Sequence, residues 1–193
     1  MKILVTNDDG IFADELWVLV RALKEIARVV VVAPDREQSA IGTAVTLSRP
    51  LRVQKVRPLI PGVTAYSVEG TPADSVILAL EKLVSGKVDL VISGINQGLN
   101  MGNDVLISGT VGAALQGYLR GFPTLAVSVS LRDNPSPNEA ARVAAWLAAK
   151  IHAANISSGI FLNVNLPDLP LSEVKGVKVT RPASESHIDT VEE

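Results

Sequence analysis

The chain contains no cysteine, and this absence excludes several kinds of chemistry. Disulfide bonds, thiolate zinc sites and cysteine nucleophiles all need a residue type that is missing. The absence fits a reducing cytoplasm, which is the location we expect. Histidine is scarce as well, since only His152 and His187 are present, both late in the chain. His152 falls in an expected helix, where a surface or packing role is the better interpretation, so a zinc site is not expected.

Blocks of basic residues and long apolar runs are also missing. The 193 residues carry a formal net charge of −2 without any run of lysine or arginine, which argues against a nucleic-acid polymer or a polybasic membrane anchor. The first apolar run is interrupted by the polar residues Asn7, Asp8 and Asp9, so it reads neither as a signal peptide nor as a membrane span. We therefore expect no membrane partner. A small anionic substrate remains compatible with this charge, because local dipoles and a metal ion attract anions without a basic surface.

Several familiar nucleotide and phosphate motifs are absent. Neither GxGxxG nor GxxxxGK[ST] follows an expected strand, which counts against a dinucleotide oxidoreductase and a P-loop NTPase. The haloacid-type phosphatase pattern also fails, because it requires two aspartates separated by one residue and Asp8 is adjacent to Asp9.

Short apolar runs alternate along the chain with segments of helical periodicity, which is typical of parallel βαβ units in one α/β domain. Two helix starts carry capping signals: Asp14 near the first helix, and Thr71 followed by Pro72 and Asp74 at the second. Strands are expected at 3–5, 28–33, 43–47, 51–56, 66–68, 88–92, 124–129 and 160–164, and helices at about 16–26, 71–84 and 111–119 and from 136.

Two adjacent carboxylates follow the first expected strand, at Asp8 and Asp9. They lie at the carboxyl end of that strand, where open α/β sheets place their ligand sites. Adjacent aspartates repel each other and stay ionised most easily with a divalent cation between them. Gly10 supplies the break that lets both side chains face one ion. The alternative is an ordinary aspartate-rich turn that ends in glycine.

Three loops should converge at this edge of the sheet, namely 7–10, 35–42 and 93–110. Their polar atoms are nearly all oxygen, which favours Mg²⁺, Mn²⁺ or Ca²⁺ over zinc. Taken alone, Ser39 is better interpreted as a loop hydroxyl bonded to the backbone. The oxygen donors that could reach one ion are Asp8, Asp9, Ser39 and Asn96.

The segment Ser108-Gly109-Thr110 directly precedes an expected helix. A helix amino terminus presents free N–H groups and a positive dipole end to an anion, so a phosphate could bind here opposite the metal. The alternative is a plain serine cap followed by a glycine that allows close packing.

Four segments together resemble the SurE family, the stationary-phase survival proteins: NDDGI, APDREQSAIG, GTPADSV and SGINQGLNMGNDVLISGTVGAA. The match runs in order over nearly the whole chain. The resemblance implies a divalent-metal-dependent phosphatase that acts on nucleoside 5′- and 3′-monophosphates and, in some members, on short polyphosphate. It also implies a Rossmann-like three-layer α/β/α core with a mostly parallel sheet, one Mg²⁺ or Mn²⁺ per subunit, and a homodimer or homotetramer.

The family's functional residues can be carried over to this sequence one by one. Asp8 and Asp9 are the expected catalytic residues, either as a base toward water or, for one of them, as the nucleophile itself. The metal ligands of the family fall on Asp8, Asp9, Ser39 and Asn96, and the phosphate contacts fall on Asn7, Ser108, Gly109 and Thr110.

The end of the chain departs from the family pattern. Family members generally continue past a strand expected here at 177–181 into a hairpin and an arm exchanged between subunits, whereas this chain stops at Glu193. We expect residues 1–180 to form the phosphatase core and 181–193 to begin an incomplete extension, in a truncated chain or a short member. Two other functions stay open: a non-catalytic, metal-assisted nucleotide or phosphate sensor, and a Rossmann-like oxidoreductase or glycosyltransferase that holds a metal–diphosphate.

Overall fold

The computed structural model of the chain describes residues 1–130, 137–167 and 169–183. His187 and most of the expected carboxyl-terminal extension lie outside these residues. No helix in the described part of the chain is both long enough and apolar enough to span a bilayer.

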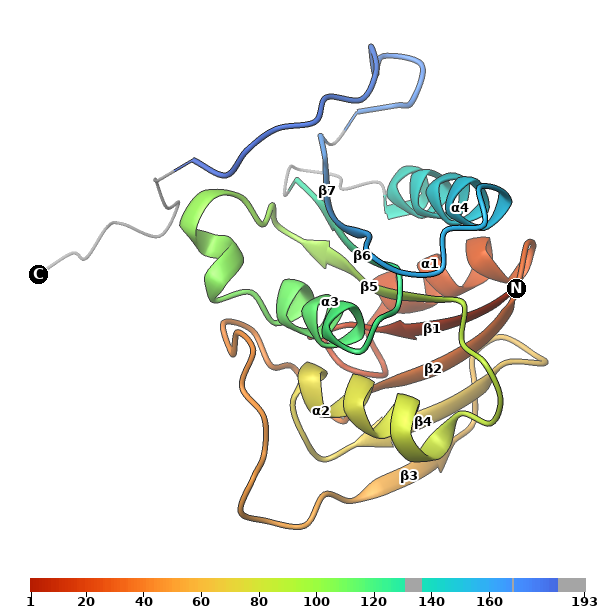
Figure 1. Cartoon of the computed structure of the whole chain (residues 1–193), viewed down its shortest axis with the longest axis vertical. Helices are drawn as coiled ribbons and strands as arrows, with labels where there is room; N and C mark the ends of the chain where they lie inside the picture. The colour runs from red at the N-terminus through yellow and green to blue at the C-terminus, as the bar shows by residue number, and fades with distance from the viewer. Residues whose placement is uncertain (131–136, 168, 184–193) are drawn as a thin grey trace, which may run out of the picture.

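Seven strands form one sheet in the order β3-β4-β2-β1-β5-β6-β7 (Figure 1). Neighbouring strands pair in parallel, except that β3 runs antiparallel to β4. The strands are β1 (Lys2–Thr6), β2 (Arg28–Pro34), β3 (Val53–Val56), β4 (Thr64–Val68), β5 (Leu90–Gln97), β6 (Thr124–Val129) and β7 (Phe161–Leu166).

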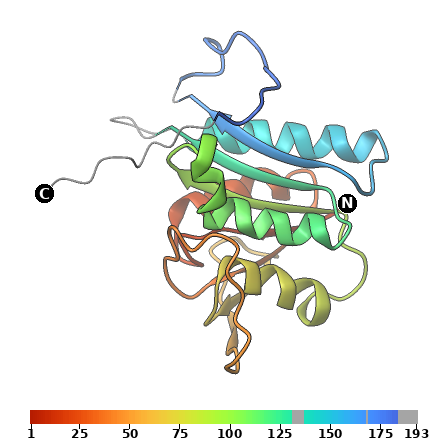
Figure 2. The ribbon, with the colours of Figure 1, turned by 60° about the vertical axis from the view of Figure 1, so that its left-hand side comes forward.

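Helices cover both faces of the sheet, which confirms the expected three-layer α/β/α fold. The pair α1 and α4 packs on one face and the pair α2 and α3 on the other, as Figures 1 and 2 show. The helices are α1 (Asp14–Lys24), α2 (Pro72–Leu78) with its π-helical continuation η1 (Ala79–Leu83), the 3-10 turn η2 (Gly102–Leu106), α3 (Gly109–Leu119) and α4 (Pro137–Ala153).

The apolar run of β1 explains why the sheet is buried on both faces. Ile3 and Val5 belong to the core cluster under α1 and α4, whereas Leu4 between them belongs to the cluster under α2. All three side chains are fully buried. Successive strand residues point to opposite faces, so a continuous apolar run is what a sheet covered on both sides requires.

Two expected strands are wrong, because neither segment has a strand partner among the residues that the structure describes. Residues 43–47 form no strand; Thr46 instead bonds through its main-chain N–H and its hydroxyl to the buried carboxylate of Asp74. Residues 177–181 are also without strand structure, and Val177 and Val179 are exposed. β-branched residues favour a strand only where a neighbouring strand supplies hydrogen bonds and packing.

The helix starts were predicted with mixed success. Thr71 caps α2 in a complete capping box with Asp74, with Pro72 at the first position, as expected. Asp14 is not the cap of α1, because Ala13 occupies that position and makes no side-chain cap bond. Asp14 is instead the first helical residue, where its negative charge still faces the positive end of the helix dipole.

Candidate active site

The turn after β1 is held by the side chain of Asn7. Its amide oxygen accepts a hydrogen bond from the Gly10 N–H, and its amide nitrogen donates to the Gly10 carbonyl oxygen, both at 3.1 Å. Gly10 has φ +102°, and a Cβ there would lie 3.1 Å from the main chain of Arg36. Asn7 is fully buried, so the structure gives it a role in shaping this turn. Its expected contact with phosphate stays a prediction.

Asp8 packs against the amino terminus of α3. Its side chain is buried and accepts hydrogen bonds from the hydroxyl and the main-chain N–H of Thr110. A Cβ on Gly109 would lie 2.8 Å from the Asp8 Cβ, so only glycine lets the helix approach this closely. Burial raises the pKa of Asp8, even though the bonds from Thr110 act in the opposite direction.

Asp9 is less buried than Asp8 but is less well satisfied. Its Oδ2 atom is buried and has no hydrogen-bond partner among the described residues. Its pKa is raised from 3.8 to about 7, first by burial and then by the negative charges of Asp8, Glu15 and Glu37. A carboxylate in this environment gains strongly from a cation, because the cation replaces lost hydration and offsets the neighbouring charges.

The charges that surround Asp9 come from three different segments of the chain. The sequence reading did not place two of these charged residues, Glu15 and Glu37, in the site. Glu15 lies in the first turn of α1, where the side-chain amide of Gln97, the last residue of β5, bonds to it. Glu37 lies in the loop after β2. No spacing in the sequence pairs either residue with the two aspartates. The one available signal was that Glu37 falls in the loop 35–42, which was expected at this edge of the sheet. We call Asp8, Asp9, Glu15 and Glu37 the acidic cluster.

The loop after β2 reaches the site through its backbone. The Gln38 N–H donates to the Asp8 carbonyl oxygen at 2.7 Å, which fixes the loop beside the first turn. Ser39 is exposed, and its hydroxyl donates to Glu37 Oε1 at 2.7 Å, so it bonds neither to the backbone nor to an aspartate. The structure therefore brings the loop to Asp8, and Ser39 as a metal ligand stays a prediction.

Asn96 lies on β5, next to β1 at the same edge. Thr6 of β1 is paired with Ser93 of β5. Asp9 lies three residues after Thr6, and Asn96 lies three residues after Ser93. The pairing of β5 with β6 shifts register between Gly94 and Asn96, which redirects the end of the strand. The Asn96 amide nitrogen donates to the Gly98 carbonyl oxygen at 2.7 Å. Its amide oxygen is therefore the atom of this side chain that could coordinate a cation.

Ser108 caps α3, since its hydroxyl oxygen accepts a hydrogen bond from the Val111 N–H at 3.1 Å. Gly109 provides the close approach to Asp8, and Thr110 bonds to Asp8 directly. The segment therefore does what a cap with a packing glycine does. The negatively charged group at this helix terminus is the carboxylate of Asp8. Phosphate binding by Ser108, Gly109 and Thr110 stays a prediction.

A polar network that the sequence reading missed holds the long loop after β5. The Asn100 N–H donates to Asn165 Oδ1 and its side-chain amide donates to Ser128 Oγ, both at 2.8 Å. Asn163 in turn donates to the Asn100 carbonyl oxygen at 2.8 Å. The two asparagines that alternate in β7 were the available signal, because alternate residues of a strand share one face. The network ties the loop to the ends of β6 and β7.

The donor set at this edge suits a hard cation. The structure holds no group of three or more histidine, cysteine, aspartate or glutamate side chains able to bind a metal ion, as far as its described residues go. A site here would therefore combine the two aspartates with neutral oxygens. Asp9 Oδ2 has no hydrogen-bond partner among the described residues, and the pKa of both aspartates is raised. Both observations fit such a cation, because its positive charge would stabilise the ionised form of the two carboxylates.

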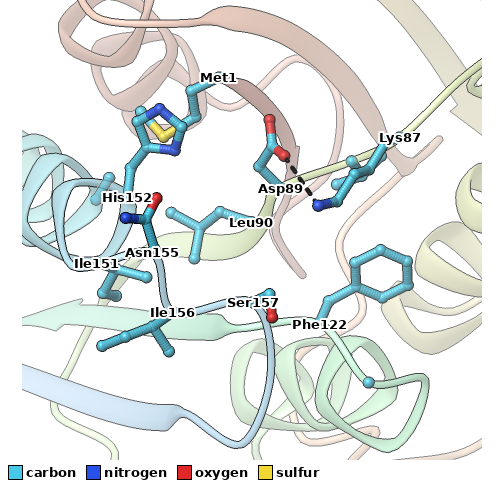
Figure 3. Close-up of a pocket in the computed structure, with 13 residues that line it drawn as sticks. Met1, Lys87, Asp89, Leu90, Phe122, Ile151, His152, Asn155, Ile156 and Ser157 are labelled. Atoms are coloured by element: carbon cyan, nitrogen blue, oxygen red, sulfur yellow. Dashed lines mark ion pairs between the residues drawn. The ribbon is translucent and has the colours of Figure 1, made fainter.

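Two cavities of the described structure lie away from this site. One of about 300 Å³ opens at the amino-terminal edge of the sheet, where Figure 3 shows the His152 ring beside the Met1 side chain. On its other side Lys87 pairs with Asp89 at 4.0 Å (Figure 3). His152 thus lies on the exposed face of α4 against this cavity, remote from the two aspartates, in agreement with a surface or packing role.

Comparison with known proteins gives a consistent result. A model of the family described as Survival protein SurE matches residues 3–189. The chain is 58% identical over 195 residues to the 5′-nucleotidase SurE of Dehalococcoides mccartyi strain CBDB1, covering 100% of this chain and 74% of that protein. It is 45% identical over 192 residues to the 5′-nucleotidase SurE of Citrifermentans bemidjiense, covering 99% of this chain and 75% of the relative. The crystal structure of a SurE protein from Aquifex aeolicus superposes with a TM-score of 0.84 at 40% identity, covering 94% of this chain and 72% of that one.

Proposed function

We propose, because this chain belongs to the Survival protein SurE family, that it is a 5′-nucleotidase that hydrolyses nucleoside 5′-monophosphates to nucleoside and phosphate. The names of relatives at 45% and 58% identity support the reaction. The observation that carries its location is the pair of carboxylates at the carboxyl end of β1, in which Asp9 Oδ2 is buried and has no hydrogen-bond partner among the described residues.

The proposed site includes one divalent cation, Mg²⁺ or Mn²⁺. The residues that would hold it are Asp8, Asp9 and Asn96, with Ser39 joining them if its hydroxyl leaves Glu37. When bound, the cation supplies positive charge against the phosphate oxygens of the substrate. The raised pKa of both aspartates supports this assignment, because a nearby cation would allow both to ionise at neutral pH.

The two aspartates then have different tasks in the proposed mechanism. Thr110 holds Asp8 through its hydroxyl and its main-chain N–H, so Asp8 is fixed in position and is assigned the role of a metal ligand. Asp9 is more exposed than Asp8, and if the cation takes one of its oxygens, the other oxygen is the better base toward an attacking water. Direct attack by an Asp9 oxygen on phosphorus is the alternative, and a phosphorylated Asp9 trapped in acid-quenched enzyme would identify it.

The amino terminus of α3 is the proposed phosphate cradle. The Gly109 N–H precedes the donors already used by Asp8 and lies at the positive end of an eleven-residue helix. Ser108 keeps the helix start in place through its cap bond to Val111. Asn7 contributes by holding the turn that presents both aspartates.

Finer features of the proposal follow the family resemblance. They are activity on 3′-monophosphates and short polyphosphate, a homodimer or homotetramer, a cytoplasmic location, and a catalytic core at 1–180 followed by the start of an extension. Light scattering of the purified chain measures the assembly. The competing function is a nucleotide or phosphate sensor, which would use the same residues without turnover.

The decisive experiment is phosphate release from a panel of 5′- and 3′-nucleoside monophosphates and tripolyphosphate. It is run with Mn²⁺, with Mg²⁺ and in buffer stripped of divalent metal, with the wild-type chain, Asp9→Asn and the matched exposed control Glu173→Gln. We expect release that requires a metal, is lost in Asp9→Asn and is unchanged in the control. Saturable nucleotide binding by folded protein without release under any metal would favour the sensor.

A further inference from the structure

A second cavity, of about 370 Å³, is lined by basic side chains and by no acidic ones among the described residues. The basic residues come from four elements: Lys2 from β1, Lys24 from α1, Arg28 from β2 and Lys55 from β3. We call it the basic cavity. Such a concentration of positive charge is unexpected in a chain whose formal net charge is −2.

The basic cavity lies at the opposite edge of the sheet from the acidic cluster. Lys2 and Arg28 are the first residues of β1 and β2 and are paired with each other. Asp8 and Asp9 follow the last residue of β1, so the strand separates the two sites by at least about 13 Å at 3.3 Å per residue. A ligand of one site therefore cannot touch the other unless it is long and extended.

Two of the four positive charges of the cavity are held in place by hydrogen bonds without being neutralised. Lys2 Nζ donates to the Ser85 carbonyl oxygen at 2.6 Å, and Lys24 Nζ donates to the Pro61 carbonyl oxygen. Each ammonium keeps two further N–H donors. None of the four basic residues forms an ion pair within the described part of the chain.

Nearby acidic groups do not change this balance. The Asp89 carboxylate accepts a hydrogen bond from the main-chain N–H of Lys2, but it lines the neighbouring cavity and pairs there with Lys87. Glu25 follows Lys24 in the chain and is exposed, and it does not line the basic cavity. Like charges gathered without counter-charge repel each other, and a bound anion would remove that repulsion.

We propose that the basic cavity binds a small anion that carries two or more phosphate groups. Four cations exceed what a single phosphate needs, and the volume suits a ligand of this size. Arg28 offers a planar fork to phosphate oxygens, whereas the lysines act as point charges. Thr64, Tyr66 and Ser85 line the same cavity, and each carries a hydroxyl that can act as a hydrogen-bond donor. This site is independent of the proposed nucleotidase reaction.

The test is calorimetric titration of tripolyphosphate in buffer freed of divalent metal by a chelating resin. Metal removal leaves the acidic cluster repulsive to phosphate, so binding there is suppressed. We expect one site in the wild-type chain and affinity at least about tenfold weaker in the double variant Lys24→Gln/Arg28→Gln, since the variant loses two charged donors to phosphate oxygens. The matched double variant Lys175→Gln/Lys178→Gln, with both lysines exposed elsewhere, should bind like the wild type.

Two further titrations determine where the anion binds and what kind of ligand the cavity recognises. Asp9→Asn should keep the binding in full, which separates this site from the nucleotidase site. ATP in place of tripolyphosphate identifies the source: tighter binding means a nucleotide whose base contacts the cavity, and equal binding means that the phosphates alone are recognised. If the double variant does not fold, Lys55→Gln replaces it. Equal binding by the wild type and the cavity variants, or no binding at all, would overturn the proposal.

Discussion

Replacing Asp9 with asparagine should stabilise the metal-free protein above neutral pH, although the same change should abolish the proposed activity. The reason is that the folded chain resists the ionisation of Asp9. Its Oδ2 is buried and finds no hydrogen-bond partner in the described part of the chain, and three negative charges lie around it, those of Asp8, Glu15 and Glu37. Asparagine fills nearly the same volume without carrying charge.

The size of the effect follows from the pKa of Asp9. A rise from 3.8 to about 7 corresponds to roughly 4 kcal/mol of free energy between the two protonation states. Asp9 is only partly buried, and solvent screening reduces the contribution to about 2 kcal/mol. In a chain of this size 2 kcal/mol raises the melting temperature by about 4–8 °C.

The pH dependence has a definite sign. Below pH 3.8 Asp9 is protonated in both the folded and the unfolded chain, so it contributes nothing. Between pH 3.8 and about 7 the unfolded chain releases the proton while the folded chain retains it, so stability falls as the pH rises. Above pH 7 the full penalty is present. Asp9→Asn should therefore match the wild type near pH 4 and exceed it at pH 8.

Divalent metal should reverse the order of the two proteins. A cation that binds only the folded wild type adds about 2.7 kcal/mol at one hundred times its dissociation constant. Asp9→Asn loses a charged ligand and should gain much less. The assay is urea and thermal unfolding at pH 4.5, 6 and 8, with and without Mn²⁺, with Glu173→Gln as the exposed control of equal charge change. A variant less stable than the wild type at pH 8 without metal, or a difference that does not change with pH, would refute this reasoning.

Three more predictions test how the site is built. Thr110→Val removes the hydroxyl donor of Asp8 and should cost about 1–3 kcal/mol at pH 8 by urea unfolding, with weaker metal binding in calorimetry. Gly109→Ala places a Cβ 2.8 Å from the Asp8 Cβ. It should cost about 1–3 kcal/mol from overpacking and lower metal-dependent phosphate release, whereas unchanged release would show that Asp8 can move. Asp74→Ala should destabilise the chain by about 2–3 kcal/mol in thermal unfolding without changing the metal affinity, because it breaks the α2 capping box and both bonds from Thr46.

The parts of the fold that the sequence predicted are those with a strong local pattern. Continuous apolar runs predicted the parallel strands, and the expected strand at 124–129 agrees residue for residue with β6. The capping box of α2 was read from three residues because the interaction is local. The aspartate pair was recognised for the same reason, since its position after β1 follows from the strand alone.

The parts that the sequence did not predict depend on contacts between distant residues. The segment 43–47 is rich in the β-branched residues typical of a strand, but a carboxylate 28 positions away holds its backbone instead. Glu15 joins the site because α1 begins beside the end of β5, and no pattern around Glu15 indicates this. The asparagine network of the long loop joins residues up to 65 positions apart. Such bonds have no period, so periodicity cannot reveal them.

The same reasoning explains why the charge distribution was missed. A formal net charge of −2 without basic blocks argued against a nucleic-acid polymer or a polybasic membrane anchor and gave no indication of a basic surface. The structure instead gathers scattered cations into the basic cavity at one edge of the sheet and scattered acids into the acidic cluster at the other. The parallel strands produce most of this separation, because they bring their starts to one edge and their ends to the opposite edge, while the antiparallel strand β3 adds Lys55 near its own end to the edge of the starts. A phosphate approaching the acidic cluster without a cation meets repulsion, so metal should bind before substrate at that edge, whereas multivalent phosphate should bind to the basic cavity with no metal at all.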